Sequence, residues 1–414
     1  MPEVLFLAHR IPYPPNRGDK IRSWHVLREI AQFARVHLAC FADDEEDAAH
    51  LTGLRAALGD RLGNAHVEVR TTSRASAALQ ALRSGQPMSL TAFASEEMQT
   101  FVRSKLPGVD AIYAFSGQMA QFVPAGARPR FVMDFVDVDS AKFADYAEEA
   151  RGPMRLVYAR EAKRLAVFEA EVSARADTSL FVSEAEAALF RRRTGLPSIA
   201  ALANGIDSDF FDPAASFPRL TREERGEGPL LLFTGQMDYR PNVDAVRWFA
   251  GEVLPLLPGA RFVIAGRNPA PEVTALAGPR VTVTGSVKDM RSWLAAADIV
   301  VAPLRIARGV QNKVLEAMAM ARPVVASSAA FEGIEAEGGR HLLVEDGADA
   351  MAQAITSILG DPARAAELGR AARDLVATTY RWEARLAPLR NLLLPRAATA
   401  QPTPVPALSV ADIS

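Results

Sequence analysis

Apolar residues in this chain gather in short runs, and between the runs they recur at the spacing of amphipathic helices. Runs such as V-L-F-L-A at 4–8 and L-L-L-F-T at 230–234 are almost free of polar residues, which predicts strands buried on both faces. The alternation of such strands with helices predicts an α/β protein built on parallel sheets. The first series of expected strands covers residues 4–8, 36–41, 111–114, 131–134, 178–182 and 199–203; the second covers 230–234, 262–265, 281–284, 299–302, 324–327 and 342–345; expected helices include 155–175, 185–193, 245–257, 289–296, 311–320 and 363–378.

The alternation breaks once, at 208–228, where prolines, glycines and a run of charges predict a linker. The chain on either side has the length of one doubly wound domain. Two such domains facing each other would form a cleft at the carboxyl ends of their strands, which is where ligands bind in this architecture. The expected division is a first domain over 1–207, the linker 208–228, a second domain over 229–379, a terminal helix over 380–394 and a disordered tail over 395–414.

Charge and composition exclude several classes of protein. A net charge of −2 without a basic stripe argues against a nucleic-acid partner. The six histidines and the single cysteine, Cys40, form no metal-binding pattern, so no metal is expected. The first residues predict a strand rather than a signal peptide, and no apolar run is long enough to span a membrane. A cytoplasmic protein is therefore expected.

The strongest chemical signal lies at 300–328, V-V-A-P-L-R-I-A-R-G-V-Q-N-K-V-L-E-A-M-A-M-A-R-P-V-V-A-S-S. A strand, a loop ending at Gly309 and a helix starting near Val310 would form an anion site, because the first backbone N–H groups of a helix are free. Lys313 and Glu316 are three residues apart and share one helix face. The lysine could neutralise a diphosphate and the carboxylate could accept ribose hydroxyls, although a solvated ion pair would give the same spacing.

This segment resembles the signature of family-4 retaining glycosyltransferases, in which two spaced glutamates precede A-M-A-x-G-x-P-V-V. The stretch from Glu316 (E-A-M-A-M-A-R-P-V-V) matches the second glutamate, which the resemblance implies binds the donor ribose, with Lys313 on the diphosphate. Two positions depart from the family pattern. Arg308 stands where the first glutamate contacts the donor sugar, and Ala321 replaces a glycine.

Further segments of the second half resemble the family. The turn N-G-I-D at 204–207 is similar to the turn that ends the first domain, and 231–242 is similar to the first strand and loop of the second. After Gly235 the family often has an arginine and a lysine that are absent here; Arg240 could replace one phosphate contact or simply face solvent. Arg267 follows another strand and glycine, at the expected rim of the donor site.

The first half matches more weakly. The loop after the first strand keeps one glycine, Gly18, of the family's glycine-rich loop near the donor phosphates, and could equally be a surface turn. Where the family often has a histidine that positions the sugar, this chain offers Ser116. The acids Asp134, Asp137 and Asp139 could bind acceptor hydroxyls or a metal. An acceptor-binding or structural role is preferred, because the resemblance implies that no metal is needed.

The resemblance implies a GT-B fold of two Rossmann-like domains and a nucleotide-diphosphate sugar as co-substrate, with no other cofactor. It implies transfer with retention to a saccharide or polyprenyl-linked acceptor, without a protein nucleophile. The segments around 237–242 and 308–319 are most similar to sugar transferases of bacterial exopolysaccharide gene clusters. A peripheral contact with the inner membrane face is expected through arginine-rich helices such as that ending at 191–193. Two alternatives stay open, a nucleotide-sugar epimerase of the same fold and a nucleotide-binding scaffold that has lost turnover.

Overall fold

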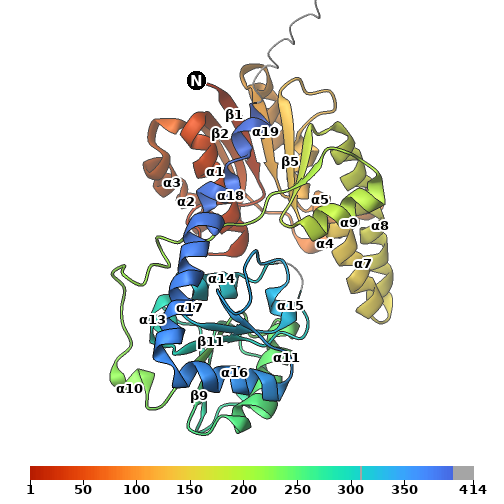
Figure 1. Ribbon diagram of the computed structural model, residues 1–414. Coiled ribbons are helices and arrows are strands. Elements are labelled where there is room, and N and C mark those ends of the chain that lie inside the picture. The colour runs from red at the N-terminus through yellow and green to blue at the C-terminus, as the bar shows by residue number, and fades with distance from the viewer. Residues whose placement is uncertain (308–309, 395–414) are drawn as a thin grey trace, which may run out of the picture. The chain divides into compact units, whose positions relative to one another are not determined.

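The computed structural model describes residues 1–307 and 310–394, which form two compact units (Figure 1). Among the described residues, unit 1 comprises 1–181, 189–200 and 387–394, and unit 2 comprises 182–188, 201–307 and 310–386. The stretch expected to be a linker, 208–228, lies within unit 2. The expected tail, 395–414, lies outside the described residues.

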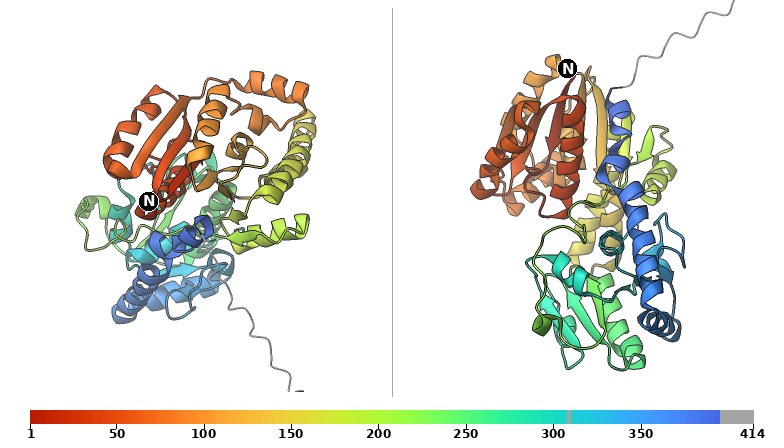
Figure 2. Two further views of the ribbon diagram at one scale, coloured as in Figure 1. Left: turned by 90° about the horizontal axis from the view of Figure 1, so that it is seen from above. Right: turned by 60° about the vertical axis from the view of Figure 1, so that its left-hand side comes forward.

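Unit 1 is built on a parallel sheet of seven strands in the order β3-β2-β1-β4-β5-β6-β7. Helices lie on both sides of this sheet, as the two views of Figure 2 show. The strands are β1 (Glu3–Ala8), β2 (Arg35–Ala42), β3 (Leu62–Val69), β4 (Ala111–Phe115), β5 (Arg130–Val136), β6 (Thr178–Phe181) and β7 (Ile199–Ala201). The helices are α1 (Gly18–Phe33), α2 (Glu45–Ala49), α3 (Leu51–Leu58), α4 (Arg74–Ser84), α5 (Met88–Thr91), α6 (Glu96–Lys105), α7 (Asp139–Glu149), α8 (Pro153–Arg175), α9 (Glu184–Thr194), which runs across the division between the units, and α19 (Leu389–Leu393).

Unit 2 is built on a parallel sheet of six strands in the order β10-β9-β8-β11-β12-β13. Its strands are β8 (Leu230–Thr234), β9 (Arg261–Ala265), β10 (Val281–Gly285), β11 (Ile299–Ala302), β12 (Val324–Ala326) and β13 (Leu343–Val344). Its helices are α10 (Arg222–Arg225), α11 (Arg240–Trp248), α12 (Pro271–Thr274), α13 (Met290–Ala296), α14 (Asn312–Ala319), α15 (Ser328–Phe331), α16 (Ala348–Gly360), α17 (Pro362–Leu375) and α18 (Trp382–Leu386). Both sheets therefore confirm the doubly wound α/β prediction.

Strand β3 and helix α11 are among the elements that differ from the sequence prediction. The edge strand β3 was not expected, because L-G-N-A-H-V-E-V mixes polar residues and a glycine into the run. Helix α11 begins at Arg240 rather than at 245, because Pro241 occupies the first turn, where a missing N–H costs no hydrogen bond.

The predicted turn at Asn204-Gly205 packs against the start of α18 and the residues just before it. A Cβ added to Gly205 would lie 2.5 Å from the Cα of Trp382, so this approach requires glycine. The Ile206 N–H donates to the Tyr380 carbonyl at 2.6 Å. The chain then continues into α19, which packs on α1, β4 and β5 of unit 1 (Figure 1). The predicted terminal helix over 380–394 is thus divided between the two units.

Among the described residues, no helix combines the length and the apolar content needed to cross a membrane.

Candidate functional site

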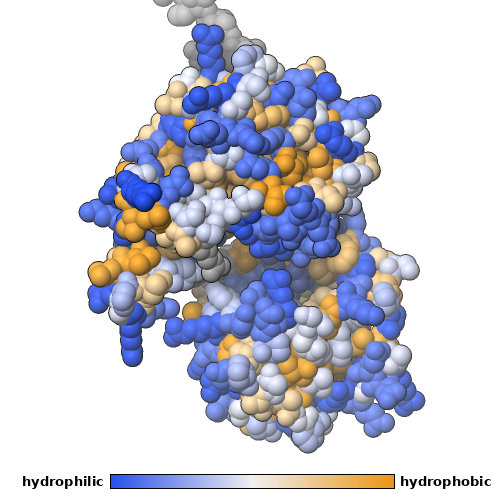
Figure 3. Space-filling model, turned by 180° about the vertical axis from the view of Figure 1, so that it is seen from behind, coloured by the Kyte–Doolittle hydropathy of each residue, from blue (hydrophilic) through white to orange (hydrophobic). Residues whose placement is uncertain are grey.

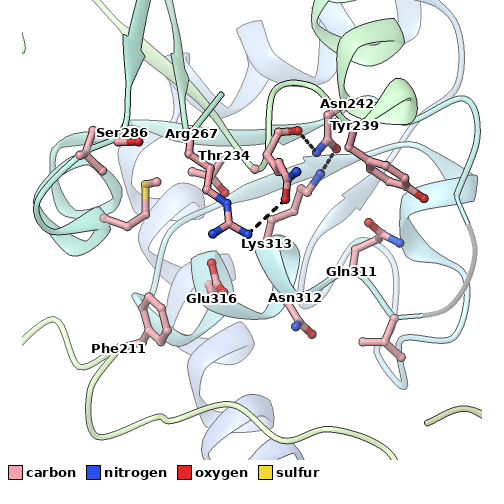
Figure 4. A pocket seen from close by; sticks show the side chains of 16 residues that line it. Phe211, Thr234, Tyr239, Asn242, Arg267, Ser286, Gln311, Asn312, Lys313 and Glu316 are labelled. Atoms are coloured by element: carbon pink, nitrogen blue, oxygen red, sulfur yellow. Dashed lines mark hydrogen bonds between the residues drawn. The ribbon is translucent and has the colours of Figure 1, made fainter. Parts of the chain in front are cut away.

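A pocket of about 600 Å³ opens at the carboxyl edge of the unit 2 sheet (Figure 4). Strand order in this sheet reverses between β8 and β11, and such a reversal leaves a crevice between the loops that leave the two strands. The loops after β8, β9 and β10 and the first turns of α14 form its walls. The lining residues are Phe211, Thr234, Gly235, Gln236, Tyr239, Asn242, Gly266, Arg267, Ser286, Val287, Met290, Val310, Gln311, Asn312, Lys313 and Glu316.

Two glycine loops form one wall of the pocket. A Cβ on Gly266 would lie 1.6 Å from the carbonyl oxygen of Gly235, and one on Gly235 would lie 2.7 Å from Nδ2 of Asn242. Both glycines have φ of 154°, which other residues rarely adopt. The loops after β8 and β9 can therefore touch because neither glycine has a side chain.

Helix α14 brings Lys313 into the pocket. Its Nζ donates to Oδ1 of Asn242 at 2.5 Å and lies 4.5 Å from the centre of the Phe233 ring. Burial lowers the pKa of Lys313 to about 8, and the nearby Glu316 carboxylate opposes that shift. At neutral pH the ammonium is therefore charged and loses its proton more easily than a solvated lysine.

Glu316 lies one turn further along the same helix face, as its spacing predicted. Burial raises the pKa of this carboxyl to about 7, and Lys313 lowers it by a smaller amount. Within the described parts of the chain, no hydrogen bond reaches the carboxylate, so both of its oxygens can accept bonds from a ligand.

A polar network that the sequence did not reveal holds Lys313 in place. Asn242, from α11, accepts from Lys313 and donates through Nδ2 to the Gln236 carbonyl at 2.8 Å. The Gln236 side chain in turn accepts from Nη2 of Arg267 at 3.1 Å. Figure 4 shows these contacts, which join the loops after β8 and β9 to α14. An Asn beside a helix start gives no sequence signal for such a role, because the role depends on which loops meet in space.

The structure brings together five of the predicted donor-binding residues, Gly235, Arg267, Val310, Lys313 and Glu316, in this pocket. Arg240 is exposed at the start of α11 and is absent from the lining, although its neighbour Tyr239 belongs to it. The predicted residues Arg308 and Gly309 lie outside the described residues.

Gly18 and Ser116, the two remaining predicted residues, belong to unit 1. Gly18 is exposed at the first position of α1, and a Cβ there would meet no atom within 4 Å. Ser116 follows β4 with a φ of 75°, and its hydroxyl donates to the Gln118 side chain. Val136, the last residue of the neighbouring β5, has a φ of 72°, a costly conformation for a β-branched residue. Strained backbone of this kind clusters at binding sites.

His9 lies at the carboxyl end of β1 and was not singled out from the sequence. Its Nε2 is 3.2 Å from Oδ2 of Asp19 and 3.2 Å from Nη1 of Arg10. Burial lowers the pKa of His9, and Asp19 opposes that shift. The loop from 9 to 20 thus holds a packed charge network, which an exposed turn would lack.

The acids in and directly after β5 have separate environments. Asp134 is fully buried and accepts hydrogen bonds from Nε of Arg22 at 3.0 Å and from the Tyr113 hydroxyl at 2.5 Å. Its role is therefore structural, in the interior of unit 1. Burial raises the pKa of Asp137.

Elsewhere in unit 1, His66, Glu68 and Glu97 place one ligand atom each within 4.8 Å of one another, at the edge strand β3 and the start of α6.

The pocket coincides with a segment that known proteins share. Residues 228–361 match the family model of glycosyl transferases group 1. This group 1 segment contains the described pocket residues apart from Phe211.

A curated relative extends the similarity. The GDP-mannose-dependent alpha-(1-6)-phosphatidylinositol monomannoside mannosyltransferase of Mycobacterium tuberculosis (strain CDC 1551 / Oshkosh) is 29% identical over 236 residues. The match covers 52% of this chain and 61% of that relative, so the chain spans about three fifths of the relative's length.

Solved structures share the fold of both units. HepE of Anabaena, determined in complex with UDP, aligns with a TM-score of 0.62 at 15% identity and covers 95% of this chain and 99% of its own. Sucrose-phosphate synthase from Thermosynechococcus elongatus aligns with a TM-score of 0.66 at 18% identity, over 95% of this chain and 98% of its own. The fold is GT-B, as the sequence predicted.

Proposed function

We propose that this chain is a glycosyltransferase that takes a sugar from a nucleotide-diphosphate donor bound in the unit 2 pocket. The observation that carries the proposal is the pairing of Lys313 and Glu316 beside the glycine loops, at the carboxyl edge of the sheet. A cation there suits a diphosphate, and a carboxylate with free acceptor capacity suits ribose hydroxyls. The match of the group 1 segment to its family supports the same assignment.

In the proposed reaction the bond from the anomeric carbon to the β-phosphate oxygen breaks and a bond to an acceptor hydroxyl oxygen forms on the same face. The departing diphosphate takes the proton of the acceptor hydroxyl. The acceptor oxygen is itself the nucleophile, so no side chain has to form a bond to the sugar. Lys313 would stabilise the negative charge that grows on the diphosphate, and the N–H groups at the start of α14 would add to that effect. Asn242 would act as a positioning residue by holding the Lys313 ammonium.

The donor and the acceptor are proposed from the relative. Its name specifies GDP-mannose and a phosphatidylinositol monomannoside, so GDP-mannose is the first donor to test and a lipid-linked saccharide, polyprenyl-linked included, is the proposed acceptor. We place the reaction at the cytoplasmic face of the membrane, in exopolysaccharide assembly.

The test compares nucleoside diphosphate binding to Glu316→Ala and to Glu272→Ala by titration calorimetry. Glu272 is an exposed glutamate of unit 2 outside the pocket and is the matched control. Glu316→Ala should weaken GDP or UDP binding by about 1–3 kcal/mol, because charged hydrogen bonds to the ribose are lost. Unchanged affinity in a folded Glu316→Ala protein would refute the ribose assignment.

A scaffold that binds the nucleotide without turnover is the second candidate, because Arg308 stands where the family's sugar-contacting glutamate is expected. Arginine donates hydrogen bonds and accepts none, so it would pair with phosphate or with an acidic sugar. If the chain is a transferase, Arg308→Ala should lower turnover more than it lowers the melting temperature. Binding of the donor without transfer or hydrolysis in the wild-type protein would favour the scaffold.

A further inference from the structure

Two helices of unit 1 carry large apolar side chains on their exposed surfaces. On α4, Leu79 and Leu82 are 50% and 70% exposed; on α8, Leu156 and Val167 are 74% and 53% exposed. Single exposed leucines scattered over a protein surface are common, but exposed apolar residues on two adjacent helices can form a contiguous apolar patch, which is typical of an interaction surface. Figure 3 shows hydrophobic residues directly beside strongly hydrophilic ones at the edge where the hairpin of α7 and α8 lies.

The exposed face of α8 combines apolar and basic residues. Residues 156, 160, 163, 164 and 167 recur at helical spacing and therefore share one face. On it Leu156, Lys163, Arg164 and Val167 are exposed, and Arg160 is half-buried. The opposite face is buried against unit 1 through Glu161, Leu165, Glu169 and Val172. The outer face of α8 thus carries apolar and positively charged side chains side by side, and its inner face packs on unit 1.

Helix α4 continues this face. Nη2 of Arg160 donates to the Ala81 carbonyl at 2.7 Å and to the Gln86 carbonyl at 3.3 Å, which ties the end of α4 to α8. A Cβ on Gly85, directly after α4, would lie 3.9 Å from Nη2 of Arg164. Leu79, Leu82 and Arg83 share one face of α4. We call the combined surface the α4–α8 face; its members are Leu79, Leu82, Arg83, Leu156, Arg160, Lys163, Arg164 and Val167.

Acidic residues are scarce in the two segments that form the face. Residues 71–94 contain no acid, and 151–168 contain Glu161 alone. Further along α8, the exposed Glu171 lies one turn after Val167 on the same face and marks the end of its basic part. Glu161 is buried and accepts from the backbone N–H groups of Met88 at 2.8 Å and Ser89 at 2.9 Å, so its charge is used inside the unit. In a chain of net charge −2, these two segments therefore carry a local excess of positive charge.

We propose that the α4–α8 face docks on an anionic lipid membrane. Basic side chains with long aliphatic stems reach phosphate headgroups, while exposed leucines enter the boundary between headgroups and acyl chains. A nucleic-acid surface would match the charge but leave the leucines without a function. Basic side chains and exposed leucines on one surface therefore favour a lipid membrane as the partner.

This face differs from the one expected from the sequence. The arginines at 191–193 end α9, but no large apolar side chain among the described residues of α9 is exposed to the same degree. Charge without an apolar component gives weaker and more salt-sensitive attachment. The α4–α8 face is the stronger membrane surface because it has both.

Membrane docking fits the proposed function, since a lipid-linked acceptor is reached at a bilayer, but the two are tested by different measurements. Vesicle binding does not involve the unit 2 pocket, and nucleoside diphosphate binding needs no lipid. A protein that binds GDP or UDP and ignores vesicles would overturn the membrane proposal and leave the proposed function standing.

The experiment is co-sedimentation of the full chain with vesicles of phosphatidylcholine alone or mixed in equal parts with phosphatidylglycerol. The wild-type protein should sediment with the mixed vesicles and stay in solution with pure phosphatidylcholine. The double variant Lys163→Glu/Arg164→Glu should lower the partition coefficient at least about tenfold, because each basic residue near a charged surface contributes strongly. Leu82→Ser/Leu156→Ser should lower it by a similar factor while keeping the salt dependence of wild-type binding.

The matched control is Arg340→Glu/Arg370→Glu, which changes the net charge equally at exposed positions of unit 2. It should bind vesicles within about twofold of wild type. An equal loss in this control and in Lys163→Glu/Arg164→Glu would overturn the proposal, because net charge alone would then explain binding. Loss of a dimer in Leu82→Ser/Leu156→Ser, with no vesicle binding in the wild type, would instead identify a second copy of the chain as the occupant.

Discussion

Glu316 and Lys313 have shifted pKa values that bracket neutral pH, and this gives nucleotide binding a specific pH dependence. Glu316 is ionised above about 7 and Lys313 is charged below about 8. A ribose bond needs the ionised carboxylate and a diphosphate needs the ammonium. Affinity should therefore be highest between these two values, fall as the pH drops below 7 because Glu316 gains a proton, and fall as the pH rises above 8 because Lys313 loses one.

Calorimetric titrations with GDP or UDP at about pH 6, about 7.5 and about 9 would measure this profile. Glu316→Gln should bind more weakly than wild type near neutral pH, and the difference should shrink at acid pH, where both side chains are neutral. Since the nucleotide phosphate also titrates, the difference between the two proteins is the informative quantity. A constant difference across the acid range would show that Glu316 does not titrate there.

At the scale of elements, the contact between the loops after β8 and β9 depends on two glycines. Gly266→Ala places a Cβ against the Gly235 carbonyl and demands an unfavourable φ, so unfolding free energy should fall by about 2 kcal/mol or more. Nucleotide affinity should fall as well, because the displaced loop carries Arg267. Urea denaturation and calorimetry would measure both quantities.

Gly251→Ala provides the comparison for that substitution. Gly251 lies in a helical segment, and a Cβ there meets no atom within 4 Å, so alanine should be neutral or slightly stabilising. Similar losses in the two variants would mean that the contact between the glycine loops is unimportant.

Helix α19 makes a separate prediction about the end of the chain. Leu389 and Leu393 are buried, and the helix packs on α1, β4 and β5. Truncation after Pro388 should lower the unfolding free energy of unit 1 by on the order of 2–5 kcal/mol for each leucine that is lost. Truncation after Leu394, which removes the predicted disordered tail, should leave the melting temperature unchanged. The opposite order of melting temperatures would contradict the assignment of the tail.

The elements that the sequence predicted well are those with a buried, unmixed apolar run. β8 and β11 have every residue buried, and their runs were recognised at their observed bounds. β3 is an edge strand with mostly half-buried residues, so polar side chains dilute its pattern. The site followed the same logic. Helix spacing put Lys313 and Glu316 on one face and the family resemblance implied their roles, whereas Asn242 acquires its role from the tertiary approach of α11 to α14, which no local pattern records.

At the scale of the whole molecule, we predict that the proposed chemistry proceeds without a metal ion. Lys313 and Arg267 can supply positive charge to the diphosphate. Transfer or donor hydrolysis should therefore survive EDTA with a rate within about twofold of the untreated protein. Loss of turnover on chelation, restored by magnesium or manganese, would show that the phosphate site is incomplete without a cation.

The division of the chain into units has a consequence for biosynthesis. Unit 2 is nearly one continuous stretch, 201–386, whereas unit 1 needs α19, which follows that stretch. A ribosome releases the chain from its amino end, and domains made first usually finish folding first. Here the apolar surface that Leu389 and Leu393 cover on unit 1 stays open until all of unit 2 has been synthesised. Unit 1 therefore leaves the ribosome first but completes its core last. Until α19 has been synthesised, its uncovered apolar surface is one that a ribosome-associated chaperone would shield.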